Sequence, residues 1–181
     1  MKTHRAVLIL LLAAALIASS CNSRAERTNG TVLLEITSVS GVPVSVPLSG
    51  SSSFQITTVQ LANVLKDPSA TVGTNFQDIE LRSYEVTYRR RDTGTRVPPS
   101  ISARIFGTVP AGSSAILSNL SFLTNDQLLS PPLSDLSRFG RDTETGSAII
   151  VMDVSIRIFG RTISGDDVAS QTATFTIEVT P

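Results

Sequence analysis

The sequence predicts an all-β fold, an antiparallel β-sandwich that follows a short N-terminal leader. Three observations lead to this prediction. After residue 30 the chain is dominated by Thr, Ser, Val and Ile, its apolar residues alternate with a period of two, and Gly or Pro interrupts it about every ten residues. No segment after residue 30 has the apolar spacing of a helix of any length. About eight strands would fill residues 31–181, as is typical of a sandwich domain.

The strands are expected where apolar and polar residues alternate between turn signals. In chain order, they are expected at residues 31–37, 42–48, 54–59, 79–90, 101–107, 115–123, 148–159 and 173–179. Pro43 and Pro47 confine the second of these to a sheet edge or a bulge, because proline has no N–H to donate. Residues 66–77 are expected to form a loop, and residues 126–136 a crossover with little regular structure.

The longest expected strand, residues 148–159, carries the acidic residue Asp153. Asp153 lies in a run rich in aliphatic residues, on the same side as Arg157, and a cross-strand ion pair is the expected account of its carboxylate.

Residues 101–107 are similar to residues 154–160, since each run places Arg and Phe on one face and ends on Gly. We expect two similar strand ends here, because a repeat architecture needs about three copies.

The first 21 residues hold the single His and the single Cys of the chain. Residues 2–5 form a positive segment and residues 6–17 an apolar run. Residues 18–20 are small, and Cys21 follows directly. This three-part plan is that of a secretory signal peptide. The apolar run has about a dozen residues, fewer than the ~20 that a membrane-spanning helix needs.

The junction Ile17-Ala18-Ser19-Ser20-Cys21 resembles the lipobox of bacterial lipoproteins. The resemblance implies that residues 1–20 are removed, that the thiol of Cys21 carries a diacylglyceryl group, and that the new N-terminus is acylated as well. Residue 22 is Asn, whereas an Asp there retains lipoproteins of diderm bacteria in the inner membrane. The resemblance therefore implies an outer-membrane location. Residues 21–30, polar and without periodicity, would form a flexible tether.

Two stretches of the mature chain resemble parts of fibronectin type III and related immunoglobulin-like domains. Residues 83–90, Ser-Tyr-Glu-Val-Thr-Tyr-Arg-Arg, are similar to a middle strand of that fold. Residues 154–162, followed by Gly165 and a Thr-rich last strand, are similar to its final hairpin. The resemblance implies an immunoglobulin-like β-sandwich over residues 31–181.

Composition argues against several function classes. The chain of 181 residues has no net formal charge, and the mature part keeps 13 basic and 15 acidic residues, which does not suit a nucleic-acid binder. Without histidine and with Cys21 used for lipid, the mature chain lacks the groups of Ser-His-Asp or Cys-His catalysis. Lys66 is its only lysine, and no motif surrounds it. We expect neither an enzyme, a cofactor nor a metal site.

Arg89, Arg90, Arg91 and Arg96 form the densest charge in the chain, around the turn at residues 92–94. They are candidates for contact with an anionic glycan or lipid phosphate, and a solvated hairpin end is the alternative. Two acidic pairs, at residues 142/144 and 166/167, are interpreted as loop solubilisers. A calcium site and a pair of glycosidase carboxylates are the alternatives for these pairs.

The sequence thus predicts a lipid-anchored envelope protein with a binding or structural sandwich, whose partners would be the membrane and an envelope protein or glycan. Two further hypotheses remain open. One is a glycan-binding or glycan-hydrolysing module, which would need exposed rings from Tyr84, Tyr88 and the Phe residues. The other is a subunit of an envelope assembly that joins its partner by strand addition at an open sheet edge.

Overall fold

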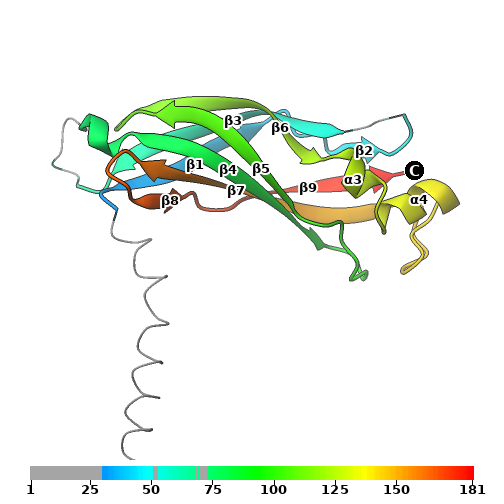
Figure 1. Cartoon of the computed structure of the whole chain (residues 1–181). Coiled ribbons are helices and arrows are strands. Elements are labelled where there is room, and N and C mark those ends of the chain that lie inside the picture. Colours follow the sequence, from blue (N-terminus) through cyan, green and yellow to red (C-terminus); the bar gives the residue numbers. More distant parts are fainter. Residues whose placement is uncertain (1–29, 51–52, 68, 70–72) are drawn as a thin grey trace, which may run out of the picture.

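The computed structural model describes residues 30–50, 53–67, 69 and 73–181. The predicted signal peptide, the predicted lipid carrier Cys21 and the predicted tether up to residue 29 lie outside these residues. Within the described ranges, nine strands form two sheets that pack face to face (Figure 1), which confirms the all-β sandwich. The strands are β1 (Val32–Ser40), β2 (Ser45–Pro47), β3 (Phe54–Leu65), β4 (Ile79–Arg90), β5 (Ile101–Val109), β6 (Ser114–Leu123), β7 (Ile150–Thr162), β8 (Asp167–Ala169) and β9 (Ala173–Thr180).

The two sheets differ in size. The smaller sheet has the strand order β1-β3-β6, and the larger sheet has the order β2-β9-β7-β4-β5, with β8 paired to the end of β7. Strand β7 lies at the centre of the larger sheet, and its residues alternate strictly between buried and half-buried positions over 13 residues. Because β3, β4 and β7 each run for 12 or 13 residues, the domain is elongated along its strands.

One pairing departs from the fully antiparallel prediction, because β2 runs parallel to β9. The chain leaves β1 in the smaller sheet and crosses to the edge of the larger sheet, where β2 contributes only three residues. The backbone N–H of Leu48 donates to the Thr180 carbonyl at 2.9 Å and extends this pairing. The edge position expected for the segment between Pro43 and Pro47 is confirmed.

Three short helices form where a loop and an irregular crossover were expected. They are η3 (Asn75–Gln77), α3 (Asn125–Leu128) and α4 (Leu133–Phe139). Helix α3 begins with a capping box, in which the Gln127 side chain accepts from the Thr124 backbone N–H at 3.1 Å. Helix α4 buries Leu133 and Leu136 on one side and ends at Gly140. Helices of four and seven residues are too short to produce a detectable helical period in the sequence.

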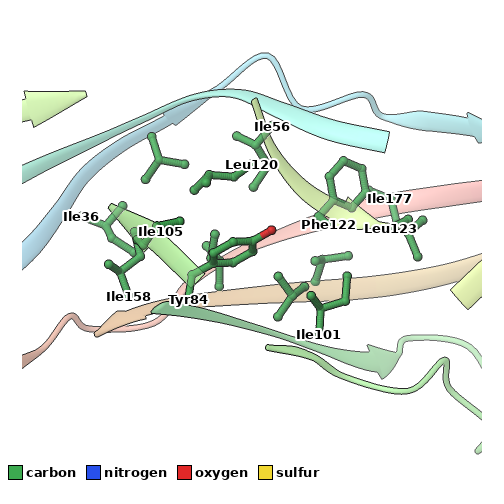
Figure 2. Packing of buried hydrophobic residues seen from close by; sticks show 14 of the residues in the cluster. Ile36, Ile56, Tyr84, Ile101, Ile105, Leu120, Phe122, Leu123, Ile158 and Ile177 are labelled. Carbon is green, nitrogen blue, oxygen red and sulfur yellow. The ribbon is translucent and has the colours of Figure 1, made fainter. Parts of the chain in front are cut away.

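The core lies between the two sheets and consists of their inward apolar side chains (Figure 2). Phe122 on β6 is fully buried, and its ring lies 5.4 Å from that of Phe175 on β9 in an edge-to-face arrangement. The centre of the Phe54 ring on β3 lies 6.4 Å from the centre of the Phe122 ring. Three strands from both sheets therefore meet at one aromatic centre in a chain that has no tryptophan. Burial of each large apolar side chain contributes about 1.5–3 kcal/mol.

Two tyrosines of β4 link the sheets through the core. Tyr84 and Tyr88 lie on the inward face of β4, as their spacing predicts. The Tyr84 hydroxyl donates to the Ser121 carbonyl at 3.0 Å, and the Tyr88 hydroxyl donates to the Phe122 carbonyl. Burial raises the pKa of both hydroxyl groups, so both remain neutral donors at physiological pH. The Tyr84 side chain is buried and the Tyr88 side chain is half-buried, and both hydroxyl groups bond into the core.

The two similar runs, residues 101–107 and 154–160, lie on strands that flank the same neighbour. Strands β5 and β7 lie on either side of β4, and Gly107 and Gly160 both stand opposite Leu81. A Cβ on Gly160 would lie 2.6 Å from Ile79 Cγ2 and 2.8 Å from the Glu80 carbonyl oxygen, so only glycine fits there. The likeness between the two runs thus reflects two strands that meet one irregular stretch of β4 from opposite sides.

The elongated domain has two ends, and they differ (Figure 1). We call the end that holds residues 30–31, helix η3 and the turns at residues 110–113 and 163–166 the proximal end. We call the end that holds the turn at residues 91–99, helices α3 and α4, and the C-terminus the distal end. The chain enters the domain at the proximal end.

A buried asparagine joins the sheets near the proximal end. The Nδ2 of Asn63 on β3 donates to the Gln77 carbonyl at 2.9 Å and to the Val109 carbonyl at 3.0 Å. Asn63 is almost fully buried, and within the described residues its Oδ1 accepts no hydrogen bond. Its donors therefore hold η3 and the end of β5 against the smaller sheet.

We expect Asn63→Leu to lower the free energy of unfolding by about 2–4 kcal/mol. Leucine keeps the volume but removes the donor to the buried Val109 carbonyl, which costs about 1–3 kcal/mol, and the donor to the half-buried Gln77 carbonyl, which costs about 1 kcal/mol. Urea denaturation measures the change. The matched control is Gln55→Leu at an exposed position of the same strand, for which we expect less than about 0.5 kcal/mol. Equal effects of the two substitutions would contradict this role of Asn63.

Candidate functional site

The distal end gathers the arginines that the sequence singles out, together with carboxylates from three other segments. We call this set the distal cluster, and it consists of Arg89, Arg90, Arg91, Asp92, Arg96, Asp135, Asp142, Glu144 and Asp153.

Arg90 is the buried centre of the cluster. It is the last residue of β4, and only 2% of its side chain is exposed. Its Nε and Nη2 donate to the two carboxylate oxygens of Asp92 at 2.6 and 2.8 Å, while Nη2 also donates to Asp142 Oδ2 at 2.9 Å. A Cβ on Gly94 would lie 2.5 Å from Arg90 Cζ, so the turn can cover the guanidinium only with glycine at that position.

Asp142 is fully buried and organises the loop that precedes β7. Besides the bond from Arg90, its Oδ2 accepts from the hydroxyl of Thr145 at 2.7 Å and from the Thr145 backbone N–H at 3.1 Å. Its own backbone N–H donates to the Ser147 carbonyl at 2.7 Å. The interpretation of this residue as a loop solubiliser is wrong for that reason: it is a structural ion-pair partner.

Glu144 and Arg96 join the two distal loops on their outer side. The Glu144 carboxylate accepts from the Thr95 hydroxyl at 2.6 Å, from the Thr95 backbone N–H at 2.9 Å and from the Arg96 backbone N–H at 3.0 Å. The Arg96 side chain reaches in the other direction, to Asp135 Oδ2 at 3.2 Å and to the Thr143 hydroxyl at 3.1 Å. Helix α4 is thereby tied to the turn after β4.

Asp153 forms the cross-strand ion pair that was expected, with Arg89 and Arg91 as its partners. Its carboxylate lies 3.3 Å from Arg89 Nη2 and 3.7 Å from Arg91 Nε, both on the neighbouring segment, and it accepts from the Thr176 hydroxyl at 2.8 Å. Arg157, which follows Asp153 on the same strand, donates to the Ser170 carbonyl at 3.2 Å. The Arg157 guanidinium carbon also lies 5.4 Å from the centre of the Phe159 ring.

The electrostatics of the cluster favour the charged forms of its members. Burial opposes ionisation of Asp142, but hydrogen bonds from Thr145 and Arg90 outweigh it and hold the pKa of Asp142 below its usual value. Hydrogen bonds from Arg90 lower the pKa of Asp92, and those from Thr95 and Arg96 lower the pKa of Glu144. Burial also opposes the charge of Arg90, and its two carboxylate partners outweigh this and raise the pKa of its guanidinium.

The cluster's positive charge is matched internally, because its four arginines face five carboxylates. Anion contact by Arg89, Arg90, Arg91 and Arg96 stays a prediction. Of the four, Arg89, Arg91 and Arg96 have side chains that reach solvent, whereas that of Arg90 does not. Arg89 and Arg91 share a face, as strand alternation predicts.

The acidic pairs do not converge on a metal site. Among the described residues, no group of three or more His, Cys, Asp or Glu side chains is placed so that it could hold a metal ion. Asp142 points to Arg90 and Thr145, whereas Glu144 points to the backbone of the opposite loop. Of the other pair, Asp166 accepts from the Ser164 hydroxyl at 3.2 Å, and Asp167 lies 3.7 Å from Arg161 Nε.

Sequence reasoning located the arginines but missed their partners. Asp142 lies 52 positions from Arg90, and no pattern in the sequence joins them. A weak local signal was present in Asp142 and Thr145, because an Asp followed three residues later by Thr can close a turn through its side chain. Asp92 offered a similar signal, since its carboxylate accepts from the Gly94 N–H at 3.0 Å.

Comparisons with known proteins identify no family. No protein-family model matches this chain, and no curated protein matches it. Among solved structures, the solution structure of AT1g01470 from Arabidopsis thaliana aligns over 82% of this chain and 80% of that one, with a TM-score of 0.38 and 11% identity. A likeness at this level carries no functional inference.

We expect Asp142→Asn to lower the free energy of unfolding by about 3 kcal/mol, because it removes a buried charge partner of Arg90. Urea denaturation measures the change. Glu178→Gln is the matched control, an acid-to-amide change at an exposed position of β9, and should shift the same quantity by less than about 0.5 kcal/mol. Similar values for the two variants would show that the buried pair contributes no stability.

The lowered pKa values also predict how stability depends on pH. A carboxylate with a lower pKa in the folded state stabilises the fold above its unfolded pKa, and this stabilisation is lost as the pH falls through the folded pKa. We expect a nearly constant free energy of unfolding from pH 7 to about pH 5, and a decline below about pH 4. In Asp142→Asn the decline should be shallower. An identical slope in both proteins would contradict the assignment of part of it to Asp142.

Proposed function

We propose that this chain is a lipid-anchored protein of the bacterial outer membrane, held by acyl chains on Cys21. The observation that carries the proposal is the junction at residues 17–21, where a short apolar run and a small-residue segment lead directly into the single cysteine of the chain. Asn22, in place of aspartate, supports the outer membrane as the location.

The physical basis of the anchor is the transfer of acyl chains into the bilayer. Each buried methylene contributes about 0.8 kcal/mol, so a single chain binds reversibly and two or more give stable attachment. Within the part of the chain that the structure describes, no helix is long and apolar enough to cross a membrane. Attachment through Cys21 would position the described domain at the membrane surface.

For the sandwich domain we propose a binding or structural role without catalysis. The supporting observation is the distal cluster, where each carboxylate is engaged by an arginine, a hydroxyl or a backbone N–H. Groups held in this way fix the positions of the loops that carry them. Recognition of an envelope protein or glycan would fall to the loops of the distal end, because loops on a rigid scaffold commonly carry binding.

Metabolic labelling tests the anchor. Cells that express the full chain and grow with radiolabelled palmitate should incorporate label into the native protein and into the control variant Ser23→Ala. Cys21→Ser should lose the label and leave the membrane fraction, while its circular dichroism shows an intact β fold after purification. Label in Cys21→Ser, or retention of that variant in membranes, would contradict the proposal. Separation of inner and outer membranes on a density gradient tests the location.

A further inference from the structure

Two large apolar side chains stand exposed next to each other at the proximal end. Phe76 in η3 is 68% exposed, and Ile163, just after β7, is 49% exposed. Their segments are joined by backbone hydrogen bonds, because the Ser164 N–H donates to the Phe76 carbonyl at 2.9 Å and the Ile163 N–H donates to the Asp78 carbonyl at 3.0 Å. We call Phe76 and Ile163 the proximal apolar pair.

Both members of the pair stand on hydrogen-bonded turns. On the Phe76 side, the Thr74 N–H donates to Gln77 Oε1 at 2.9 Å, and the Gln77 carbonyl accepts from buried Asn63. On the Ile163 side, the turn at residues 162–166 is closed by bonds between Thr162 and Asp166, including Thr162 N–H to the Asp166 carbonyl at 2.9 Å. The fold therefore presents the two side chains in fixed positions, with little ordering left to be done on binding.

The chain enters the domain beside this pair. A Cβ on Gly30 would lie 3.7 Å from Asp166 Cβ, in the same turn region as Ile163. The carbonyl of Thr31 accepts from the Lys66 N–H at 3.0 Å, which fixes the start of the domain at this end. Figure 1 shows the point of entry, β8 and the neighbouring turns together at one end, and α4 with the C-terminus at the other.

The length of the tether decides which end can lie near the membrane. From Cys21 to Gly30 there are nine residue steps, which span at most about 30 Å even when fully extended. The 13 residues of β7 alone make twelve such steps at about 3.3 Å each and span about 40 Å. Because the tether is shorter than the long axis of the domain, a lipid on Cys21 keeps the proximal end close to the bilayer.

We propose that the proximal apolar pair inserts into the lipid surface beside the anchor, as a second contact that orients the domain with its distal end away from the membrane. This inference rests on the proposed lipid anchor. An aromatic ring and a branched aliphatic chain are the side chains that membrane-surface segments bury at the boundary of headgroups and acyl chains. Insertion into the lipid surface would remove both side chains from water.

Charge near the pair identifies the kind of lipid surface. Asp67, Asp78, Asp166 and Asp167 lie at this end with Lys66 and Arg161, so carboxylates outnumber cations even without Asp78. Asp78 is turned inward, where it accepts from the Ala111 N–H at 2.8 Å, and Asp167 pairs with Arg161. Such a surface has no attraction for anionic lipids. The contact is therefore apolar, and it fits a zwitterionic lipid surface.

The absence of tryptophan from the chain makes a direct test simple. Phe76→Trp places a single fluorescent reporter in the pair, and Phe139→Trp places one at the distal end, where Phe139 is 54% exposed. Each lipidated full-length variant is reconstituted into phosphatidylcholine vesicles whose acyl chains carry bromine, a contact quencher. We expect at least twofold stronger quenching of Trp at position 76 than at position 139, with a blue-shifted emission.

A third reporter tests the alternative orientation. Phe106 is 85% exposed on β5, so Phe106→Trp reports contact through the side of the domain. Stronger quenching at position 106 than at position 76 would overturn the proposal. So would equal quenching at positions 76 and 139. A blue shift at position 76 without quenching by brominated lipid would also overturn it, because that result means a protein covers the pair.

The experiment separates failure of this inference from failure of the anchor. Mass spectrometry of the purified protein reports whether Cys21 carries lipid. In parallel, the mature chain with Cys21→Ser and an N-terminal histidine tag is bound to brominated vesicles that contain nickel-chelating lipid. Quenching at position 76 on those vesicles supports insertion even if Cys21 proves unlipidated. Lipid on Cys21 without quenching keeps the anchor and overturns insertion.

Discussion

The packing of two unequal sheets on their apolar faces is the interaction on which the rest of this structure depends. Hydrogen bonds of the strands act within each sheet, so the sheets are held together mainly by the removal of inward side chains from water. Phe122 lies where the faces meet, against Phe54 and Phe175. The long strands β4 and β7 extend this contact along the whole domain, and their length creates two ends with separate surroundings.

Each end is closed by buried polar groups, but of different kinds. At the proximal end the neutral amide of Asn63 donates to two carbonyls and supports η3. At the distal end the guanidinium of Arg90 is held between Asp92 and Asp142, and it joins loops that come from distant parts of the chain. Both arrangements specify loop positions, because a buried donor without its acceptor is costly. The proximal end presents Phe76 and Ile163 beside the point where the chain enters, and the distal end presents ion-paired loops together with Leu129 and Phe139.

The sequence predicts the repetitive part of this fold well. The strict alternation in β7 and the shared face of Tyr84, Val86 and Tyr88 follow directly from a period of two. Interactions that depend on register could not be predicted in the same way, since a period of two does not say which residue stands opposite which. A cross-strand ion pair was therefore expected for Asp153 without a named partner, and the register places it opposite Arg89. The burial of Asp142 depends on the meeting of two loops, and no local pattern encodes it.

The central claim is that the domain stands on its proximal end at a membrane surface, held by Cys21 and steadied by Phe76 and Ile163. Neutron reflectometry of the lipidated protein on a supported phosphatidylcholine bilayer measures this orientation most directly. The account predicts a protein layer that begins at the headgroups and extends about 40 Å or more, the length of the long strands. A layer only about 20–25 Å deep, the width of a sandwich lying on its side, would contradict it.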